Sequence, residues 1–149
     1  MTPIIIRSEH DYRTTVQIRQ HTVLADELVS DGGTDNAPTP MEIFVGMLGA
    51  CIAVTARAYA RRKQWPLEGI TVEVEMARIK REDYPAYDGD APFVHEFRER
   101  IRLEGPLTDE QKSRLMVIAG KCPVRQALQN PAFFVEEKLE ALAGDQPPV

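Results

Sequence analysis

One uninterrupted apolar stretch, Ile43–Tyr59, constrains the fold of this chain more than any other feature of its sequence. The stretch holds no proline and one charged residue, Arg57, so it suits a helix of about four to five turns. Thr39, Pro40 and Glu42 match an N-cap, the first helical position and the third position of a capping box. Because apolar residues occupy nearly its whole circumference, we expect this helix to be buried on most sides, in a core or a subunit interface.

Alternating residues predict strands on both sides of this helix. Before it, Ile4–Ile6, Tyr12–Arg19 and Thr22–Ala25 are expected to form a small antiparallel meander, with a turn at Gln20-His21. After it, Ile70–Ala77 and Phe93–Leu103 alternate over a long span, which indicates a hairpin with one solvated face. The turn-rich segment between these two strands predicts a long exposed loop.

The rest of the chain is expected to be mostly helical. Thr108 and Gln111 match a second capping box, followed by a helix, and Cys122 begins a short third helix. Phe133–Leu139 is predicted to be a last strand or a helix, and residues 143–149 a disordered tail. This order of elements, without repeat or linker, indicates one α+β domain that spans the whole chain, residues 1–149.

Charge and hydropathy exclude several classes of partner. The net charge of −5 argues against nucleic acid, because phosphate binding requires a basic surface. The apolar stretch falls short of about 18 residues, so no membrane-spanning segment is predicted. The N-terminus lacks the basic start and apolar run of a signal peptide, which makes the cytoplasm the expected location. In that reducing compartment, two cysteines are expected to be free or catalytic.

Cysteine is the residue type best able to carry chemistry here. Cys122 precedes Pro123 and is expected at a helix N-cap, where the dipole and free N–H groups lower the pKa of a thiol. Cys51 follows Gly49 and Ala50, small residues that let another element approach its sulfur. The alternative is that both cysteines are small buried hydrophobic residues. The histidines lack metal-binding spacing, so neither a metal nor another cofactor is predicted.

Two separated segments resemble the OsmC/Ohr family of OsmC-like proteins. The first comprises Gly32–Glu42, Leu48–Cys51 and Arg61–Leu67, and the second is Ile118–Val124. The resemblance covers about residues 12–134. It implies an α+β homodimer with intertwined subunits, in which the central helix lies at the interface beside two active sites.

The resemblance also implies a peroxidase reaction without metal or flavin. Cys51 matches the peroxide-attacking cysteine, which becomes a sulfenic acid, and Cys122 matches the resolving cysteine, which condenses with it to a disulfide. An external dithiol, a dihydrolipoyl group in the Ohr branch, would then reduce that disulfide. Apolar neighbours favour organic hydroperoxides over hydrogen peroxide as substrates; these neighbours are Phe44, Met47 and Leu48.

The family further implies an activating arginine. Burial raises the pKa of a thiol, so a cation is expected beside the attacking cysteine. In the family it comes from the N-terminal strands, and the candidates are Arg19, Arg13 and Arg7, with Arg19 preferred because it lies beside the predicted turn. The alternative is that all three are solvated residues at a strand edge.

In the family a glutamate holds that arginine from ten residues before the attacking cysteine. Here Met41 occupies that position, and Glu42 lies nine residues before Cys51. Nine helical steps put Glu42 about 180° around the helix and about 13 Å along it, out of reach of Cys51. Glu42 therefore either holds an arginine, within the chain or across the dimer, or is only a helix cap. Two other functions stay open: another cysteine enzyme such as a hydrolase, and a non-catalytic stress or ligand-binding module.

Overall fold

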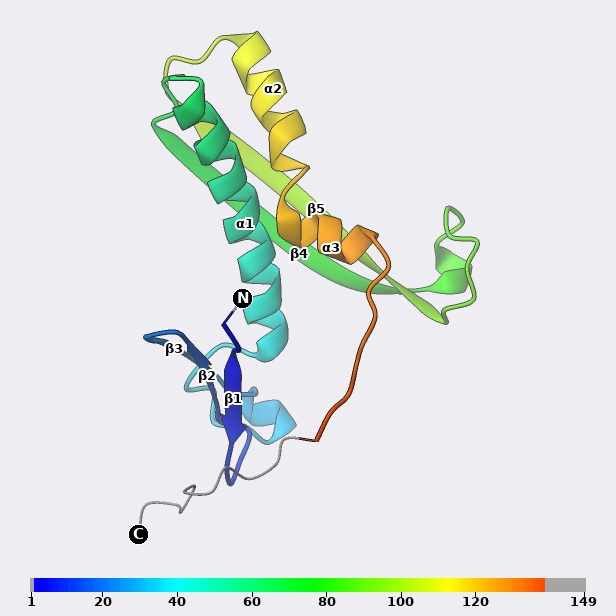
Figure 1. Ribbon diagram of the computed structural model, residues 1–149. Helices are drawn as coiled ribbons and strands as arrows, with labels where there is room; N and C mark the ends of the chain where they lie inside the picture. The colour runs from blue at the N-terminus through cyan, green and yellow to red at the C-terminus, as the bar shows by residue number, and fades with distance from the viewer. Residues whose placement is uncertain (1, 139–149) are drawn as a thin grey trace.

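The computed structural model describes residues 2–138 and has the mixed α+β architecture expected from the sequence (Figure 1). Both sheets are antiparallel, one of three strands in the order β1-β2-β3 and one of two strands, β4-β5. Single 3-10 turns, η1 (Val29–Asp31) and η2 (Arg81–Asp83), lie in the connections. The main elements are β1 (Ile5–Ser8), β2 (Thr14–Ile18), β3 (His21–Ala25), α1 (Pro40–Arg62), β4 (Gly69–Lys80), β5 (Phe93–Glu104), α2 (Asp109–Ala119) and α3 (Pro123–Gln129).

The meander is confirmed, with two shifted boundaries. The second strand begins at Thr14 instead of Tyr12, because the Asp11 carboxylate accepts a hydrogen bond from the Arg13 N–H at 2.9 Å and holds the chain in a turn. The following turn centres on Arg19 and Gln20, one residue earlier than predicted, and His21 already pairs with Ile18. Arg19 adopts a left-handed backbone there, with φ of 54°.

Helix α1 begins with the predicted capping box. The Thr39 hydroxyl accepts a hydrogen bond from the Glu42 N–H, and the Glu42 carboxylate accepts one from the Thr39 N–H at 2.8 Å. Every fourth residue then faces β4 and α2, so that one face of α1 is buried. These buried residues are Leu48, Ile52, Ala56 and Ala60.

The expectation that α1 is buried on most sides is wrong for the single chain. Met47 is 57% exposed and Val54 67% exposed, and a Cβ built on Gly46 would face open space, with no described atom outside the adjacent part of the helix within 4 Å. The helix is also longer than the apolar stretch: over its 23 residues it is long and apolar enough to cross a membrane by length and composition alone, a test that the core helix of a globular protein can also pass. The chain itself buries 28% of that apolar window.

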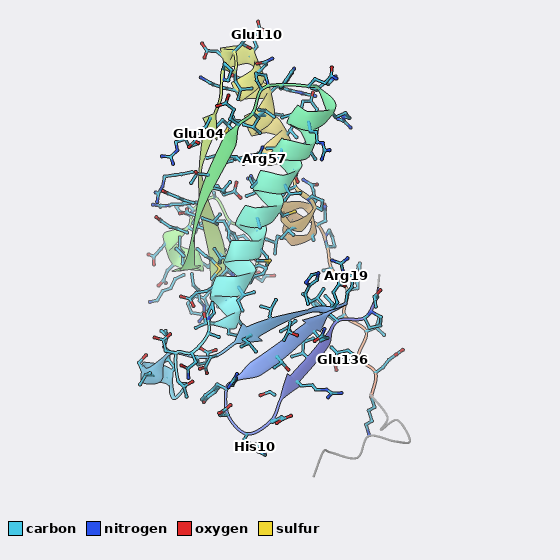
Figure 2. The ribbon with its side chains drawn as sticks, turned by 90° about the vertical axis from the view of Figure 1, so that its left-hand side faces the viewer. His10, Arg19, Arg57, Glu104, Glu110 and Glu136 are labelled. Atoms are coloured by element: carbon cyan, nitrogen blue, oxygen red, sulfur yellow. The ribbon has the colours of Figure 1, made fainter. Side chains whose placement is uncertain are left out.

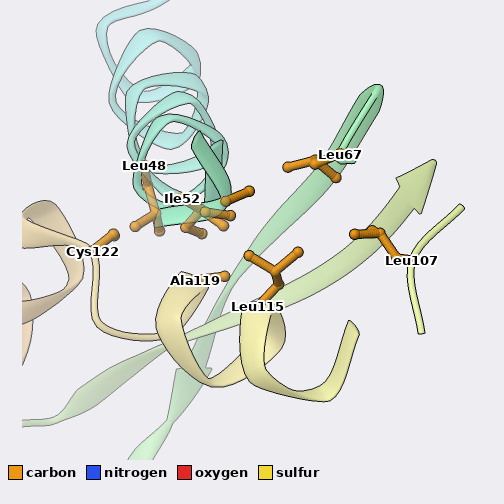
Figure 3. Close-up of a cluster of buried hydrophobic side chains, with 9 residues drawn as sticks. Leu48, Ile52, Leu67, Leu107, Leu115, Ala119 and Cys122 are labelled. Atoms are coloured by element: carbon orange, nitrogen blue, oxygen red, sulfur yellow. The ribbon is translucent and has the colours of Figure 1, made fainter. Parts of the chain in front are cut away.

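The core lies where α1, α2 and the start of α3 pack together, with apolar residues of the hairpin against it (Figure 3). Leu115 of α2 is fully buried against α1. Leu67, just before β4, and Leu107, just after β5, belong to the same cluster. Cys122 belongs to the same cluster and faces the side of α1 that carries Leu48 and Ile52. The core therefore holds α3 against the middle of α1.

The predicted strand or helix at Phe133–Leu139 is wrong for its described part, residues 133–138, which have neither form. Phe133 and Phe134 are each 90% exposed, so among residues 2–138 these apolar residues have no surface against which a regular element would be stable. The predicted tail at residues 143–149 lies outside the described part of the chain.

The loop before α1 is organised around one buried carboxylate, Asp26. Its oxygens accept hydrogen bonds from the Thr34 hydroxyl and from the N–H groups of Glu27, Thr34 and Asn36. The chain passes so close to Glu27 that a Cβ on Gly33 would lie 2.0 Å from the Glu27 carbonyl oxygen, so this position requires glycine. The Asp26 N–H also donates to the Pro38 carbonyl oxygen, which holds the segment just before α1 in place.

These hydrogen bonds predict an acid-sensitive loop. The Thr34 hydroxyl, followed by the Glu27 N–H, lowers the pKa of Asp26 from 3.8 to about 2, although burial opposes the shift. The stabilising contribution is therefore complete above pH 3.8 and is lost as the pH falls toward 2. Asp26→Asn should lower Tm at neutral pH, and thermal unfolding at a series of pH values should show that difference shrinking below pH 3.8. Asp88→Asn, at an exposed carboxylate, is the control; an equal loss in both variants, or a loss independent of pH, would contradict this role.

Candidate active site

The two cysteines, far apart in the sequence, meet between α1 and α3. Cys51 lies half-buried in the middle of α1, and Cys122 is fully buried at the N-cap of α3. Both are free thiols. The side chain of Cys51 packs against the core cluster that contains Cys122, and it lies near enough to raise the pKa of the Cys122 thiol. The fold thus places two thiols in one small cluster.

The N-cap position of Cys122 is confirmed, but the predicted effect on its acidity is wrong. Its sulfur accepts a hydrogen bond from the Arg125 N–H at 3.3 Å, as an N-cap side chain should. Burial nevertheless raises the pKa of the Cys122 thiol, and the nearby Cys51 and Glu99 raise it further. The single N–H donor opposes this shift without reversing it, because desolvation of the thiolate is the largest effect.

An ion pair that the sequence analysis did not identify lies beside this thiol. The Arg125 guanidinium on α3 donates to the Glu99 carboxylate on β5 at 2.9 Å. Glu99 faces the core between Phe97 and Ile101, opposite Val74 of β4, and its side chain is only 14% exposed. One signal was available: Glu99 interrupts the apolar face of a strongly alternating strand.

The candidate activating arginines lie elsewhere in the chain. Arg7, Arg13 and Arg19 are all exposed residues of the meander, which forms a sheet separate from the hairpin. Figure 2 shows Arg19 at the end of the β2–β3 ribbon, away from the hairpin. Within residues 2–138 of this single chain, the structure records no hydrogen bond or ion pair between these side chains and either cysteine.

Glu42 is engaged in the helix cap. Its carboxylate accepts from Thr39, and it lies nine residues before Cys51, at the start of the helix. Together with Met41 it borders an open cavity of about 670 Å³ between α1 and β4. The structure therefore assigns Glu42 a capping role, and a catalytic role stays a prediction.

Two adjoining cavities lie between the helices and the hairpin, and neither cysteine is among their lining residues. The larger, about 740 Å³, is mainly apolar and aromatic, and Phe44 packs edge-on against Phe97 at its wall. The smaller, about 280 Å³, is lined by Leu48, Glu99 and Arg125 among others. Met47, which was predicted to be a wall residue, does not line either cavity. Among residues 2–138, no three His, Cys, Asp or Glu side chains gather as a metal site.

Comparison with known proteins identifies relatives of the chain. The family model described as OsmC-like protein matches residues 33–137. No curated protein matches the chain.

Several solved structures share the fold. A Psychrobacter arcticus protein, whose name refers to osmotic stress induced and detoxification response, is 22% identical with a TM-score of 0.68, over 85% of this chain and 88% of that one. An organic hydroperoxide resistance protein OsmC from Legionella pneumophila is 17% identical (TM-score 0.62, 87% and 90% covered). An organic hydroperoxide resistance protein from Elizabethkingia anophelis is 16% identical (TM-score 0.62, 87% and 89% covered). At these identities the likeness establishes the fold alone.

Proposed function

This chain belongs to the OsmC-like protein family, and on that premise we propose that it is a cysteine-based peroxidase that reduces organic hydroperoxides. The observation that carries the proposal is the meeting of Cys51 and Cys122 in one cluster. Two neighbouring thiols can take up the two oxidising equivalents of a peroxide as one disulfide. The names of two structural neighbours, which refer to organic hydroperoxide resistance, agree with this chemistry.

The proposed reaction begins at Cys51, the more exposed of the two thiols. Its thiolate attacks the terminal peroxide oxygen, the O–O bond breaks, and the departing alkoxide takes up a proton to become an alcohol. Cys51 is left as a sulfenic acid. The Cys122 sulfur then attacks the sulfenic sulfur, the S–S bond forms, and the hydroxide leaves as water with the proton of Cys122. An external dithiol, such as a dihydrolipoyl group, reduces the disulfide by two exchange steps.

The substrate class is proposed from the lining of the larger cavity, which adjoins the smaller cavity bordered by Leu48 and Arg125. Phe44, Phe97 and Met76 are among the residues that give the larger cavity an apolar lining, which suits an alkyl or aryl body better than hydrogen peroxide. The smaller cavity, with Leu48 on one side, adjoins the cysteine cluster. A reducing compartment such as the cytoplasm would keep both thiols ready for the reaction.

We further propose that the working form is a homodimer with intertwined subunits. The apolar face of α1 that contains Met47 and Val54 is exposed in the single chain, and so are Phe133 and Phe134. Apolar surfaces of this kind mark interaction sites, and a second copy would cover them with matching residues. The same arrangement would let a meander arginine, Arg19 in the first place, approach the thiols of the other copy.

A thiol titration tests the proposed function. One equivalent of an organic hydroperoxide, added to the reduced protein, should remove two free thiols per chain and leave an intrachain Cys51–Cys122 disulfide, detected by peptide mass mapping. Slow oxidation without that link would favour a non-catalytic module. Unchanged thiols together with a covalent acyl adduct from an activated ester would favour a hydrolase instead.

A further inference from the structure

We propose that Arg125 and Glu99 are positioning residues for Cys122, which adjust its electrostatic surroundings and hold the first turn of α3 against its sulfur. This inference rests on the proposed function, in which Cys122 is the resolving thiol. Neither residue touches the reacting peroxide in that scheme. Both act through Cys122, on the step that joins its sulfur to Cys51.

The geometry connects three elements at this point. Arg125 is bound to Cys122 through its backbone N–H, 3.3 Å from the sulfur, and to Glu99 through its guanidinium at 2.9 Å. One residue thus ties the N-cap thiol of α3 to the core face of β5. The ion pair is partly buried, since 14% of the Glu99 side chain and 37% of the Arg125 side chain are exposed. A carboxylate in this position requires a partner, because an unpaired buried charge is strongly unfavourable.

The charged and titratable groups around Cys122 come from each neighbouring element. Cys51 approaches from α1, Glu99 from β5 and Arg125 from α3, while Lys121 precedes Cys122 in the chain and is exposed. Farther along β5, Glu96 is engaged by Arg98 at 2.6 Å. Glu99 raises the pKa of Cys122, but by less than burial and Cys51 do. Arg125 balances that negative charge at close range.

This arrangement suits the resolving step. Cys122 must keep its proton until Cys51 is oxidised, and must then release it to the departing hydroxide as the S–S bond forms. A carboxylate near the sulfur favours the protonated thiol, and its paired guanidinium limits that effect so that the proton can still leave. Glu99 and Arg125 therefore act in opposite directions on the same thiol.

The test uses the Cys51→Ser protein, in which Cys122 is the remaining cysteine of the sequence. Its ionisation is followed by the ultraviolet absorbance of the thiolate, which requires neither peroxide nor access of a reagent to the buried sulfur. Arg125→Gln should raise the pKa of Cys122 by about one unit, and Glu99→Gln should lower it by a similar amount. Arg125→Lys, which retains the charge, should leave the pKa of Cys122 close to that of the Cys51→Ser parent. This variant separates the effect of the charge from any loss of packing in the neutral variants.

Lys121→Gln is the matched control, because it removes the same charge from the residue next to Cys122 without breaking the ion pair. Shifts in opposite directions for Arg125→Gln and Glu99→Gln, both larger than in the control, support the inference. Shifts no larger than the control, or in the same direction, overturn it. Because this titration needs no peroxide, it decides the inference even if Cys51 proves inert toward hydroperoxides, a result that would overturn only the proposed function.

Discussion

Replacing Cys51 with serine is expected to reduce hydroperoxide turnover to the background rate, a loss of at least about a hundredfold. A serine hydroxyl at this position in α1 cannot take the peroxide oxygen, whereas the cysteine thiolate takes it and becomes a sulfenic acid. Replacing Cys122 with serine should have a different effect, because the first step does not use it. That variant should consume one equivalent of hydroperoxide per chain and then stop, with a sulfenic acid at Cys51. Stopped-flow consumption of hydroperoxide, with a sulfenic-acid trapping reagent and mass spectrometry, separates the two results.

The two cysteine variants serve as controls for each other, because each removes a single sulfur atom from the same cluster. Circular dichroism and Tm should be close to wild type for both, since serine is similar in volume to cysteine, although the buried hydroxyl at residue 122 should cost some stability. Sustained turnover by Cys51→Ser would overturn the assignment of the attacking thiol. If Cys122→Ser sustains turnover when a monothiol is the reductant, that monothiol reduces the Cys51 sulfenic acid directly. Cys122 would then be needed as the resolving thiol only when a dithiol is the reductant.

A charge introduced into the exposed apolar face of α1 is expected to have the second large effect, on dimer formation. Val54→Glu places a carboxylate in the middle of the face that we propose is covered by a second copy. Burial of an unpaired charge there should destabilise association by several kcal/mol, so the variant should be monomeric at concentrations where the wild type is dimeric. Sedimentation equilibrium measures this directly. The turnover should fall as well, because a meander arginine would no longer reach the thiols of the other copy.

Met116→Glu is the matched control, because it adds the same charge at an exposed apolar residue of α2, away from the exposed face of α1. It should leave both the molecular mass and the turnover close to wild type. A wild-type protein that sediments as a monomer would contradict the dimer. A monomeric Val54→Glu variant with full turnover would instead show that the site is complete in one chain, and Arg19 would then lose its proposed role.

Most of the fold could be predicted because its signals are local. Both capping boxes place the partner residues three positions apart, and the structure confirms Thr39 with Glu42 and Thr108 with Gln111. The hairpin pairs Ile70 with Leu103, so that the apolar residues of both strands share one face, as their alternation predicts. An error occurred where local pattern is insufficient: residues 133–138 are apolar enough for an element but, within the described part of the chain, lack a surface to pack against.

The candidate site was predicted in part, and its electrostatics were not. The N-cap position of Cys122 follows from Pro123 in the next position, which the sequence displays directly. The acidity of its thiol depends on how many atoms exclude water from the sulfur, and that number is set by α1 and β5. Desolvation then outweighs the single N–H donor, which is why the predicted direction was wrong.

By itself, the sequence determined most of the helices and strands, where α1 and α2 begin, and which family the chain resembles, because these properties depend mainly on local sequence. Only the tertiary structure brought Cys51 to Cys122 and paired Arg125 with Glu99, since α3 packs onto α1 and the hairpin through the shared apolar core. Contacts between residues far apart in the chain depend on how whole elements pack, and no short stretch of sequence records that packing.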